Sequence, residues 1–522
     1  MPRNGNSARS HRALQNDDIL REIFEYLSAP LQVFPVRQSL SDRKALLAAA
    51  RVCSSFSEHA LDGLWRDLPS VLPILKILKT SLLQIDTSYD MREYILQGPV
   101  SAAEFRRFLS YSRRVRALRE VQLHNEKISP SVFQLLSYLA RGKPLFPSLR
   151  TLGWEQYHPC GTEVLAFLSP SLRTLSLTIG EPRNPEDMST LGGIICNFAC
   201  QISDLPLQSL MIDDLHISPL FIRTLAHFKH LRVLTIKRPI AVQELTLSLA
   251  GLEDLERLDI TLDDSEVPPD DKPLACFNSM KNLSVYRGTA SGLLHILRAT
   301  STSRSLHTCE IEMLPLPATS SATFQKALRV LSRSSLRTVL VNCEPTRGFP
   351  KFTQYRDMVY PLFKSRGLRD VSLSFDDPTI CLADNDIKGM AEAWPKLVSL
   401  TLFQCGSDPP IASIFSLFAF ASQCPDLESL VFSNTNFLPT CPDRLDDVPV
   451  MSHRLQCLEL RSLWNSSPEA VQQSARFLHR VFPEMECICE DDGEQCGLSD
   501  VLEHFQAVRR EQLERTGRCL IA

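Results

Sequence analysis

The sequence predicts an α/β fold: a solenoid of stacked repeats with a parallel sheet inside and helices outside, preceded by a small three-helix module. Three observations predict it. A six-residue apolar pattern recurs along most of the 522-residue chain. A helical stretch precedes most copies, and residues 14–68 show helical periodicity without the pattern. A fixed period of this length indicates one structural unit repeated in space.

The repeated pattern has the form L-x-x-L-x-L, and thirteen clear copies start 23 to 35 residues apart. They occupy residues 118–123, 149–154, 172–177, 207–212, 231–236, 255–260, 280–285, 306–311, 336–341, 368–373, 397–402, 427–432 and 455–460. A degenerate copy, MECICE, lies at 485–490. Pattern and period are those of leucine-rich repeats.

Each copy is predicted to form a short strand. Its second and third apolar residues are two positions apart and therefore point to one face. Helical stretches such as SVFQLLSYLA (131–140) and DIKGMAEAW (386–394) lie between strands. Stacked units bury a continuous core that one unit cannot bury alone. A doubly wound α/β domain is the alternative, but it would not keep one motif through a dozen strands.

The third, fifth and seventh positions of each copy are expected to face away from the buried leucines. Charged and aromatic residues there are candidates for binding a partner protein, and a merely solvated sheet face is the alternative for each of them. The candidates are Glu155, Lys237, Arg257, Asp259, Tyr286, Glu310, Glu312, Asn342, Asp370, Phe403, Glu459 and Arg461.

Residues 14–68 are predicted to form three short helices. QNDDILREIFEYL has Asn16 as its N-cap and acids in the first turn. SDRKALLAAARVCSSF (41–56) and SEHALDGLWRDL (57–68) follow after a loop. A domain this small is marginal alone and carries more apolar residues than one small core can hide. Its apolar surface therefore binds a partner or packs on the first repeat as a cap.

The arrangement DDILREIFEYL, then LLAAARVCSSFSEHALDGLWRDL, resembles the F-box motif. With the repeats behind it, the chain is similar to fungal F-box proteins with leucine-rich repeats. The family's leucine-proline pair would fall at Gln15 and Asn16, and the loop from Ser28 to Ser41 is longer than usual. The matching positions are Ile19, Ile23, Phe24, Val52, Cys53, Phe56, Leu64 and Trp65.

The resemblance implies a non-catalytic substrate-recognition subunit of a Skp–cullin–F-box ubiquitin ligase. The module would bind a Skp-type adaptor and through it cullin, and the repeats would bind an unknown protein substrate. A leucine-rich-repeat scaffold or inhibitor without a ubiquitin-ligase link is the alternative. The candidates for adaptor binding are Ile19, Leu20, Ile23, Phe24, Val52, Phe56, Leu64 and Trp65. Some of these residues must pack inside the module instead.

The expected organisation has five segments. They are a disordered tail at 1–13, the F-box-like module at 14–68, a helical linker or N-terminal cap at 69–117, the repeat array at 118–490, and a loop with a capping helix at 491–522. The arginines in the tail leave a mitochondrial presequence as its alternative.

Composition narrows the partners and the compartment. The net charge of −4 provides no basic footprint for nucleic acid. The longest apolar run, at 411–424, is too short to span a membrane. Sixteen cysteines, many at apolar positions, and no signal peptide favour the cytoplasm or nucleus.

No cofactor, metal or catalytic residue is expected. Cys487, Cys489, Cys496 and His504 lack the pair spacing of a zinc site. The sequence also contains no phosphate-binding loop, dinucleotide fingerprint or nucleophile elbow.

Overall fold

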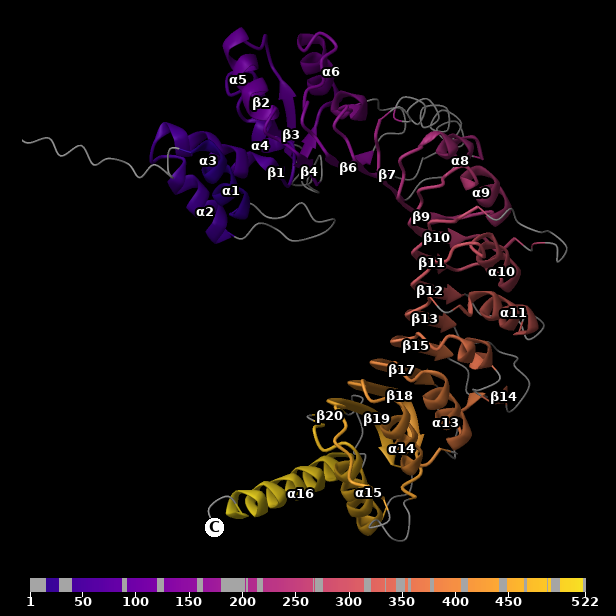
Figure 1. Ribbon diagram of the computed structural model, residues 1–522. Helices are drawn as coiled ribbons and strands as arrows, with labels where there is room; N and C mark the ends of the chain where they lie inside the picture. The colour runs from indigo at the N-terminus through magenta and orange to yellow at the C-terminus, as the bar shows by residue number, and fades with distance from the viewer. Residues whose placement is uncertain are drawn as a thin grey trace, which may run out of the picture. The chain divides into compact units, whose positions relative to one another are not determined.

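The chain forms two compact units, Met1–Arg238 and Pro239–Ala522. Figure 1 shows the computed structural model with its elements labelled. The residues it describes are 16–27, 40–86, 92–119, 126–156, 163–179, 202, 205–213, 219–265, 267, 276–313, 321–333, 335–343, 353–354, 358–375, 380–404, 412–440, 448–463, 467–485, 487–489 and 498–519.

The first unit begins with helices α1 (Asp17–Tyr26), α2 (Leu40–Ala49) and α3 (Ser54–Arg66). The side chain of Asn16 accepts a hydrogen bond from the backbone N–H of Asp18 at 3.0 Å, which confirms the expected N-cap. The helix boundaries after Ala49 differ from the prediction. Cys53 is extended, with φ −159° and ψ 170°, so the second helix ends early and the third begins at Ser54.

The three helices share one core. Its buried residues are Leu20, Phe24, Leu46, Ala60 and Leu64. The ring of Phe24 meets the ring of Phe56 edge-on, with 5.6 Å between centroids. Leu68, expected on the third helix, lies instead in a two-residue strand, β1 (Asp67–Leu68), that pairs with β4 (Ala117–Leu118). The helical module thus leads directly into the parallel sheet.

Between β1 and β4, the segment expected to be a helical linker also contains strands. The elements here are α4 (Leu72–Leu75), β2 (Leu82–Asp86), β3 (Arg92–Leu96) and α5 (Ala102–Ser112). β2 pairs antiparallel with β3, and β3 pairs parallel with β5 (Glu126–Ile128). The rest of the first unit contains α6 (Pro130–Leu139), β6 (Thr151–Gln156), η2 (Glu163–Phe167), β7 (Thr174–Ile179), β8 (Ser209–Asp213), α8 (Pro219–Thr224), η3 (Leu225–His227) and β9 (Val233–Ile240).

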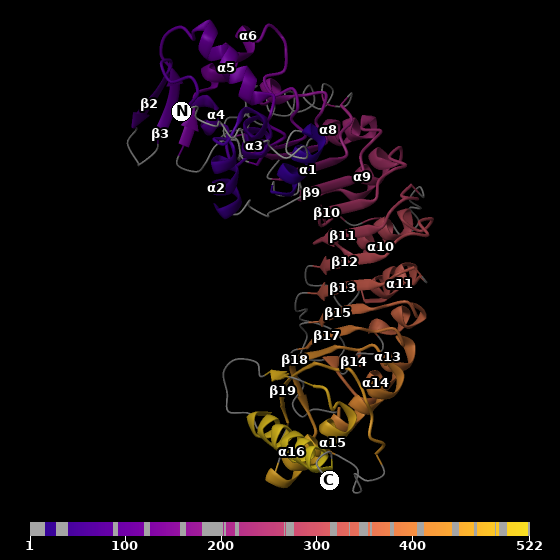
Figure 2. The same cartoon turned by 60° about the vertical axis from the view of Figure 1, so that its left-hand side comes forward.

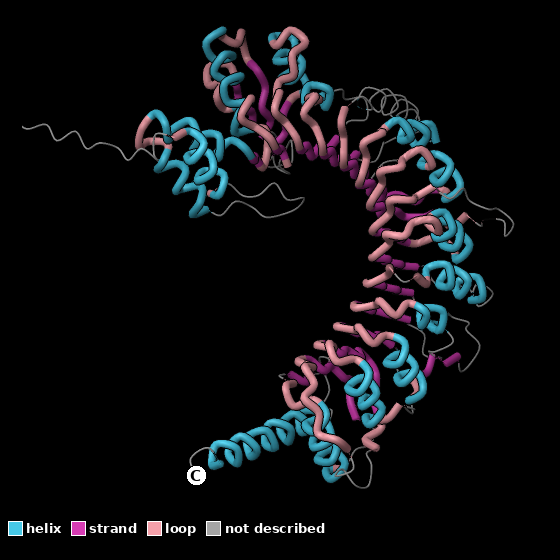
Figure 3. Tube along the Cα trace, viewed as in Figure 1, coloured by secondary structure: helices cyan, strands magenta, loops and turns pink. Residues whose placement is uncertain are grey.

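The second unit repeats strand and helix in chain order. Its parallel strands are β10 (Arg257–Leu262), β11 (Asn282–Tyr286), β12 (Thr308–Met313), β13 (Thr338–Cys343), β15 (Asp370–Phe375), β17 (Ser399–Gln404), β18 (Ser429–Phe437), β19 (Cys457–Leu463) and β20 (Cys487–Cys489). Its helices are α9 (Val242–Leu249), α10 (Ala290–Ala299), α11 (Ser321–Leu331), η5 (Tyr360–Lys364), α13 (Asp384–Ala393), η6 (Ile414–Leu417), α14 (Phe418–Gln423), α15 (Pro468–Val481) and α16 (Leu498–Cys519). A separate pair joins β14 (Thr353–Gln354) to β16 (Ile380–Cys381). In both Figure 2 and Figure 3, α9 to α13 line one side of the strand row.

The strands stack in register, so equal repeat positions stand side by side. Asn282, Thr308 and Thr338, each the third position of its copy, are partners across β11, β12 and β13. In the copies from 149–154 to 455–460, the first residue lies two residues before the strand and is buried, as are the fourth and sixth positions. This alternation confirms the leucine-rich-repeat fold. It also explains why the same apolar pattern recurs in each repeat, because each leucine fills the same layer of the core. The copy expected at 118–123 differs, because Leu118 lies within β4 and pairs with Leu152, the fourth position of the next copy. Its positions 120–123 lie outside the described residues.

The last helix closes the second unit. Val501 and Phe505 of α16 are buried, and Phe505 contacts His479 of α15 with 5.4 Å between ring centroids. Among the described residues, no helix has both the length and the apolar character needed to cross a bilayer.

Candidate functional site

Helix α1 of the module has two apolar faces. Leu20 and Phe24 point into the core and are 2 % and 4 % exposed. Ile19, Ile23 and Tyr26 are 38 %, 46 % and 94 % exposed. Their i, i+4, i+7 spacing places these three side chains on one face of the helix. We call Ile19, Ile23 and Tyr26 the α1 apolar face.

The structure sorts the eight adaptor-binding candidates. Ile19, Ile23 and Val52 are exposed, whereas Leu20, Phe24 and Leu64 are buried. Phe56 and Trp65 are partly buried against the core. The three buried residues hold the helices together and present no surface to a partner. Two exposed apolar residues that the sequence did not single out are Tyr26 on α1 and Leu47 on α2.

Trp65 joins the module to the segment that follows. Its ring contacts Tyr111 of α5 with 4.7 Å between centroids. At the same contact between α3 and the end of α5, which we call the seam, Arg114 binds Glu58 at 2.5 Å and also Asp62. Burial alone would lower the pKa of Arg114, but its hydrogen bonds to both acids outweigh this effect and raise it. The module is therefore fixed to the segment after it while the α1 apolar face stays in solvent.

In the second unit, the face of the sheet that points away from the helices contains a groove of about 540 Å³ across β12, β13, β15 and β17. Leu340 and Phe403 supply its apolar surface and are 37 % and 36 % exposed. Glu310 and Glu312 line the same groove, and no Lys or Arg lines it among the residues that the structure describes. We call it the strand-face groove. It combines apolar contact area with negative charge.

Three other strand-face candidates form hydrogen bonds with residues on neighbouring strands. Tyr286 donates a hydrogen bond to Glu310 at 3.2 Å, and burial, followed by the charge of Glu310, raises the pKa of that phenol. Glu459 accepts one from Ser433 at 2.9 Å, and Asp370 accepts one from Thr338 at 3.3 Å.

The remaining candidates do not share one open binding surface. Asp259 was expected to face a partner, but it is buried and its carboxylate pairs with Arg257 at 2.9 Å. Lys237 pairs with Asp213 of β8 in the first unit. Glu155 is partly exposed on β6, Asn342 is exposed in the groove, and the side chain of Arg461 lies outside the described residues.

Four cysteines of the second unit are core residues, whereas Cys53 is exposed and Cys457 is partly buried. Cys276, Cys309, Cys343 and Cys424 are buried free thiols. Burial raises the pKa of each to about 12, so none is a thiolate at neutral pH. Cys487, Cys489 and Cys496 fall outside the described side chains.

No family model matches the chain, and no curated protein matches it. An internalin (inlF) from Listeria monocytogenes is similar in structure, with 13 % identity and a TM-score of 0.40 over 70 % of this chain and 95 % of that one. The protein in a TLR13–ssRNA13 complex shows 16 % identity and a TM-score of 0.34 over 68 % of this chain and 55 % of that one. The chain thus spans about half the length of the second protein. The in-register strands themselves establish the leucine-rich-repeat fold.

Proposed function

We propose that this chain is a substrate-recognition subunit of a Skp–cullin–F-box type ubiquitin ligase. The helical module binds a Skp-type adaptor, and the strand face of the repeats binds the target protein. The observation that carries the proposal is the α1 apolar face: Ile19, Ile23 and Tyr26 remain in solvent although the opposite face of the same helix fills the core.

Exposure of three large apolar side chains on one short helix costs free energy unless a partner covers them. Each such side chain contributes about 1.5–3 kcal/mol when it is fully buried. Apolar positions on both faces of a helix are typical of a helix that lies between its own core and a second protein. The resemblance of residues 14–68 to the F-box motif supplies the identity of that second protein.

The residues that line the strand-face groove indicate the chemistry of the target segment. Leu340 and Phe403 suit an apolar anchor, and Glu310 and Glu312 favour a neighbouring Lys or Arg. The target segment that fits is therefore an apolar side chain flanked by basic residues. The chain itself performs no chemistry in this role, and it acts by holding the target near the ligase.

A second function, a scaffold or inhibitor without a ligase link, is favoured by the contact of Trp65 with Tyr111. In that function, the module only caps the repeat array. A cap alone does not account for the α1 apolar face, which the contacts of Trp65 leave uncovered.

The test is binding of a purified Skp-type adaptor to the full chain, measured by calorimetry. Ile19→Ser combined with Ile23→Ser removes apolar contact area without touching the core and should weaken binding about tenfold or more. Leu247→Ser on α9, which changes a 67 % exposed leucine, is the matched control. Absence of binding by the unaltered chain would support the scaffold.

A further inference from the structure

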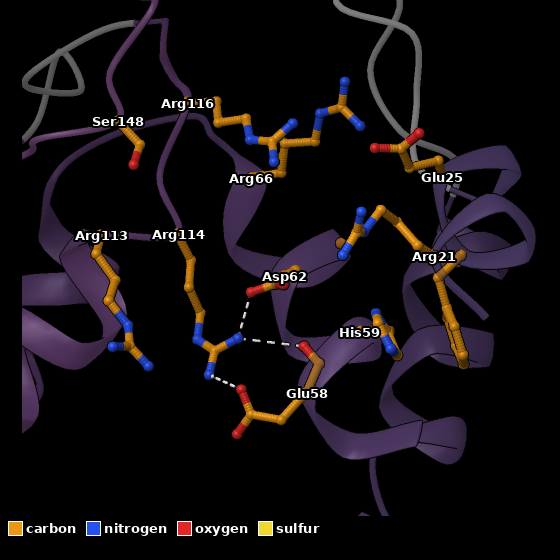
Figure 4. A pocket seen from close by; sticks show the side chains of 12 residues that line it. Arg21, Glu25, Glu58, His59, Asp62, Arg66, Arg113, Arg114, Arg116 and Ser148 are labelled. Atoms are coloured by element: carbon orange, nitrogen blue, oxygen red, sulfur yellow. Dashed lines mark hydrogen bonds and ion pairs between the residues drawn. The ribbon is translucent and has the colours of Figure 1, made fainter. Parts of the chain in front are cut away.

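A second pocket, of about 370 Å³, lies in the first unit beside the seam. It is lined by α1, α3 and the turn from α5 to β4, and five arginines face it. They are Arg21, Arg66, Arg113, Arg114 and Arg116. Figure 4 shows the guanidinium groups of Arg66 and Arg116 next to one another, with Arg113 on the other side of Arg114. We call this pocket the arginine pocket. Such a concentration of cations is unexpected in a chain with a net charge of −4.

Strand register brings the arginines together. Asp67 is the partner of Ala117, so Arg66 at the end of α3 and Arg116 each stand directly before one of two neighbouring strands. The backbone N–H of Arg116 donates to the carbonyl of Arg66 at 2.8 Å, and that of Arg150 donates to the carbonyl of Arg116 at 2.7 Å. Neighbouring strands are about 4.8 Å apart. The backbone ladder thus holds like charges side by side.

Carboxylates compensate only part of this charge. Arg114 pairs with Glu58 and Asp62, and Arg21 pairs with Asp17 and Asp18. Among the described residues, Arg66, Arg113 and Arg116 have no ion pair within 4.0 Å.

Arg66 is the most poorly satisfied of these three. Its Nε is buried and has no hydrogen-bond partner among the described residues. Burial, followed by the charge of Arg116, lowers the pKa of Arg66. A buried donor without a partner is costly, so an anion that accepts a hydrogen bond from this Nε–H would stabilise the arrangement.

We propose that the arginine pocket binds a small phosphate-bearing molecule, held by Arg66, Arg113 and Arg116. Guanidinium groups match phosphate oxygens in bidentate geometry. Ser148, at the edge of the same pocket, adds a hydroxyl donor. The volume lies at the lower end of the range for small-molecule sites, about 300–1,000 Å³. A small organic phosphate therefore fits better than a protein segment. This proposal is independent of the ubiquitin-ligase role.

The test is calorimetry and thermal melting of the full chain with pyrophosphate, glucose 6-phosphate, sulfate and a phosphoserine peptide at one fixed ionic strength. The phosphate-bearing small molecules should bind and raise the melting temperature. Arg66→Ala and Arg116→Ala should each weaken binding about tenfold or more. Arg66→Lys should not restore it, because lysine lacks the bidentate fork. Arg107→Ala on α5, an exposed arginine outside the pocket, is the charge-matched control.

The ligand-free melting temperature separates a binding role from a structural one. Arg66→Ala should leave it unchanged or raised, because the substitution removes a partly buried, uncompensated cation. A lower melting temperature together with unchanged phosphate affinity would show that Arg66 is structural and would overturn the proposal. So would sulfate binding as well as the phosphates, binding of the peptide alone, or no binding by any of them.

Discussion

Helix α1 and strand β13 each present one large side chain to the core and the one before it in sequence to solvent. In β13 the two point to opposite faces of the sheet, and in α1 they lie on adjacent faces of the helix. In β13, Val341 is buried and Leu340 is 37 % exposed in the strand-face groove. In α1, Phe24 is buried and Ile23 is 46 % exposed. The groove mixes its leucine with polar residues and acids, whereas the outer face of α1 contains three large apolar side chains. The difference indicates a mostly dry, apolar contact for α1 and a mixed, charged contact for the groove.

The largest expected effect separates Phe24 from Ile23. Phe24→Ala empties a buried position and should lower the free energy of unfolding of the module by about 3–5 kcal/mol. Ile23→Ala should change it by no more than about 0.5 kcal/mol. Urea unfolding followed by circular dichroism measures both. Equal losses would mean that Ile23 also belongs to the core.

Two leucines of the repeats, one buried and one in the groove, allow the same comparison of stability. Leu373 of β15 is buried, and Leu373→Ala should cost about 2–5 kcal/mol. Leu340→Ala should cost little in stability and should weaken target binding instead. Denaturant midpoints of the two variants, compared with the unaltered chain, test this. A large loss of stability in Leu340→Ala would contradict its assignment to an open groove.

A smaller effect is expected at the seam. Arg114→Ala removes hydrogen bonds to Glu58 and Asp62, both of which are largely exposed, and should cost about 1 kcal/mol. Differential scanning calorimetry with Arg107→Ala as the control measures this. If both variants melt alike, the ion pairs do not hold the module to its neighbour.

The smallest effect is the response to acid. A hydrogen bond from Arg114 lowers the pKa of Glu58, and hydrogen bonds from Thr80 and Ser101 lower that of Glu104 to about 2. A carboxyl group whose pKa is lower in the folded chain stabilises the fold above its unfolded pKa. That stability is lost as pH falls from about 4.5 toward the folded value. Glu104→Gln should melt with a shallower dependence on pH in this window; an unchanged slope would contradict the assignment.

The sequence predicted the repeats well because their signal is periodic. Leucines at fixed spacing must share a core layer, and strands such as β10 to β19 formed at those copies. The boundary between α2 and α3 was not predictable in the same way, because no proline or glycine marks the extended backbone at Cys53.

The candidate sites were predictable only in part. Both stripes of α1 are apolar, so periodicity alone could not decide that Leu20 faces inward and Ile23 outward. The arginine pocket depends on the register between β1 and β4, which joins Arg66 to Arg116 across an intervening segment of different structure. The strand-face candidates already included Glu310, Glu312, Asn342 and Phe403 of the groove. They missed Leu340, the fifth position of the copy at 336–341, because the search was for charged and aromatic residues.

The central claim is that the α1 apolar face binds a Skp-type adaptor. The most direct measurement is the dissociation constant of the full chain for a purified adaptor, compared between the unaltered chain, the Ile19→Ser/Ile23→Ser variant and Leu247→Ser. The account predicts binding that the double substitution weakens about tenfold or more and that Leu247→Ser leaves unchanged. Equal affinity of all three proteins, or no binding by the unaltered chain, would contradict it.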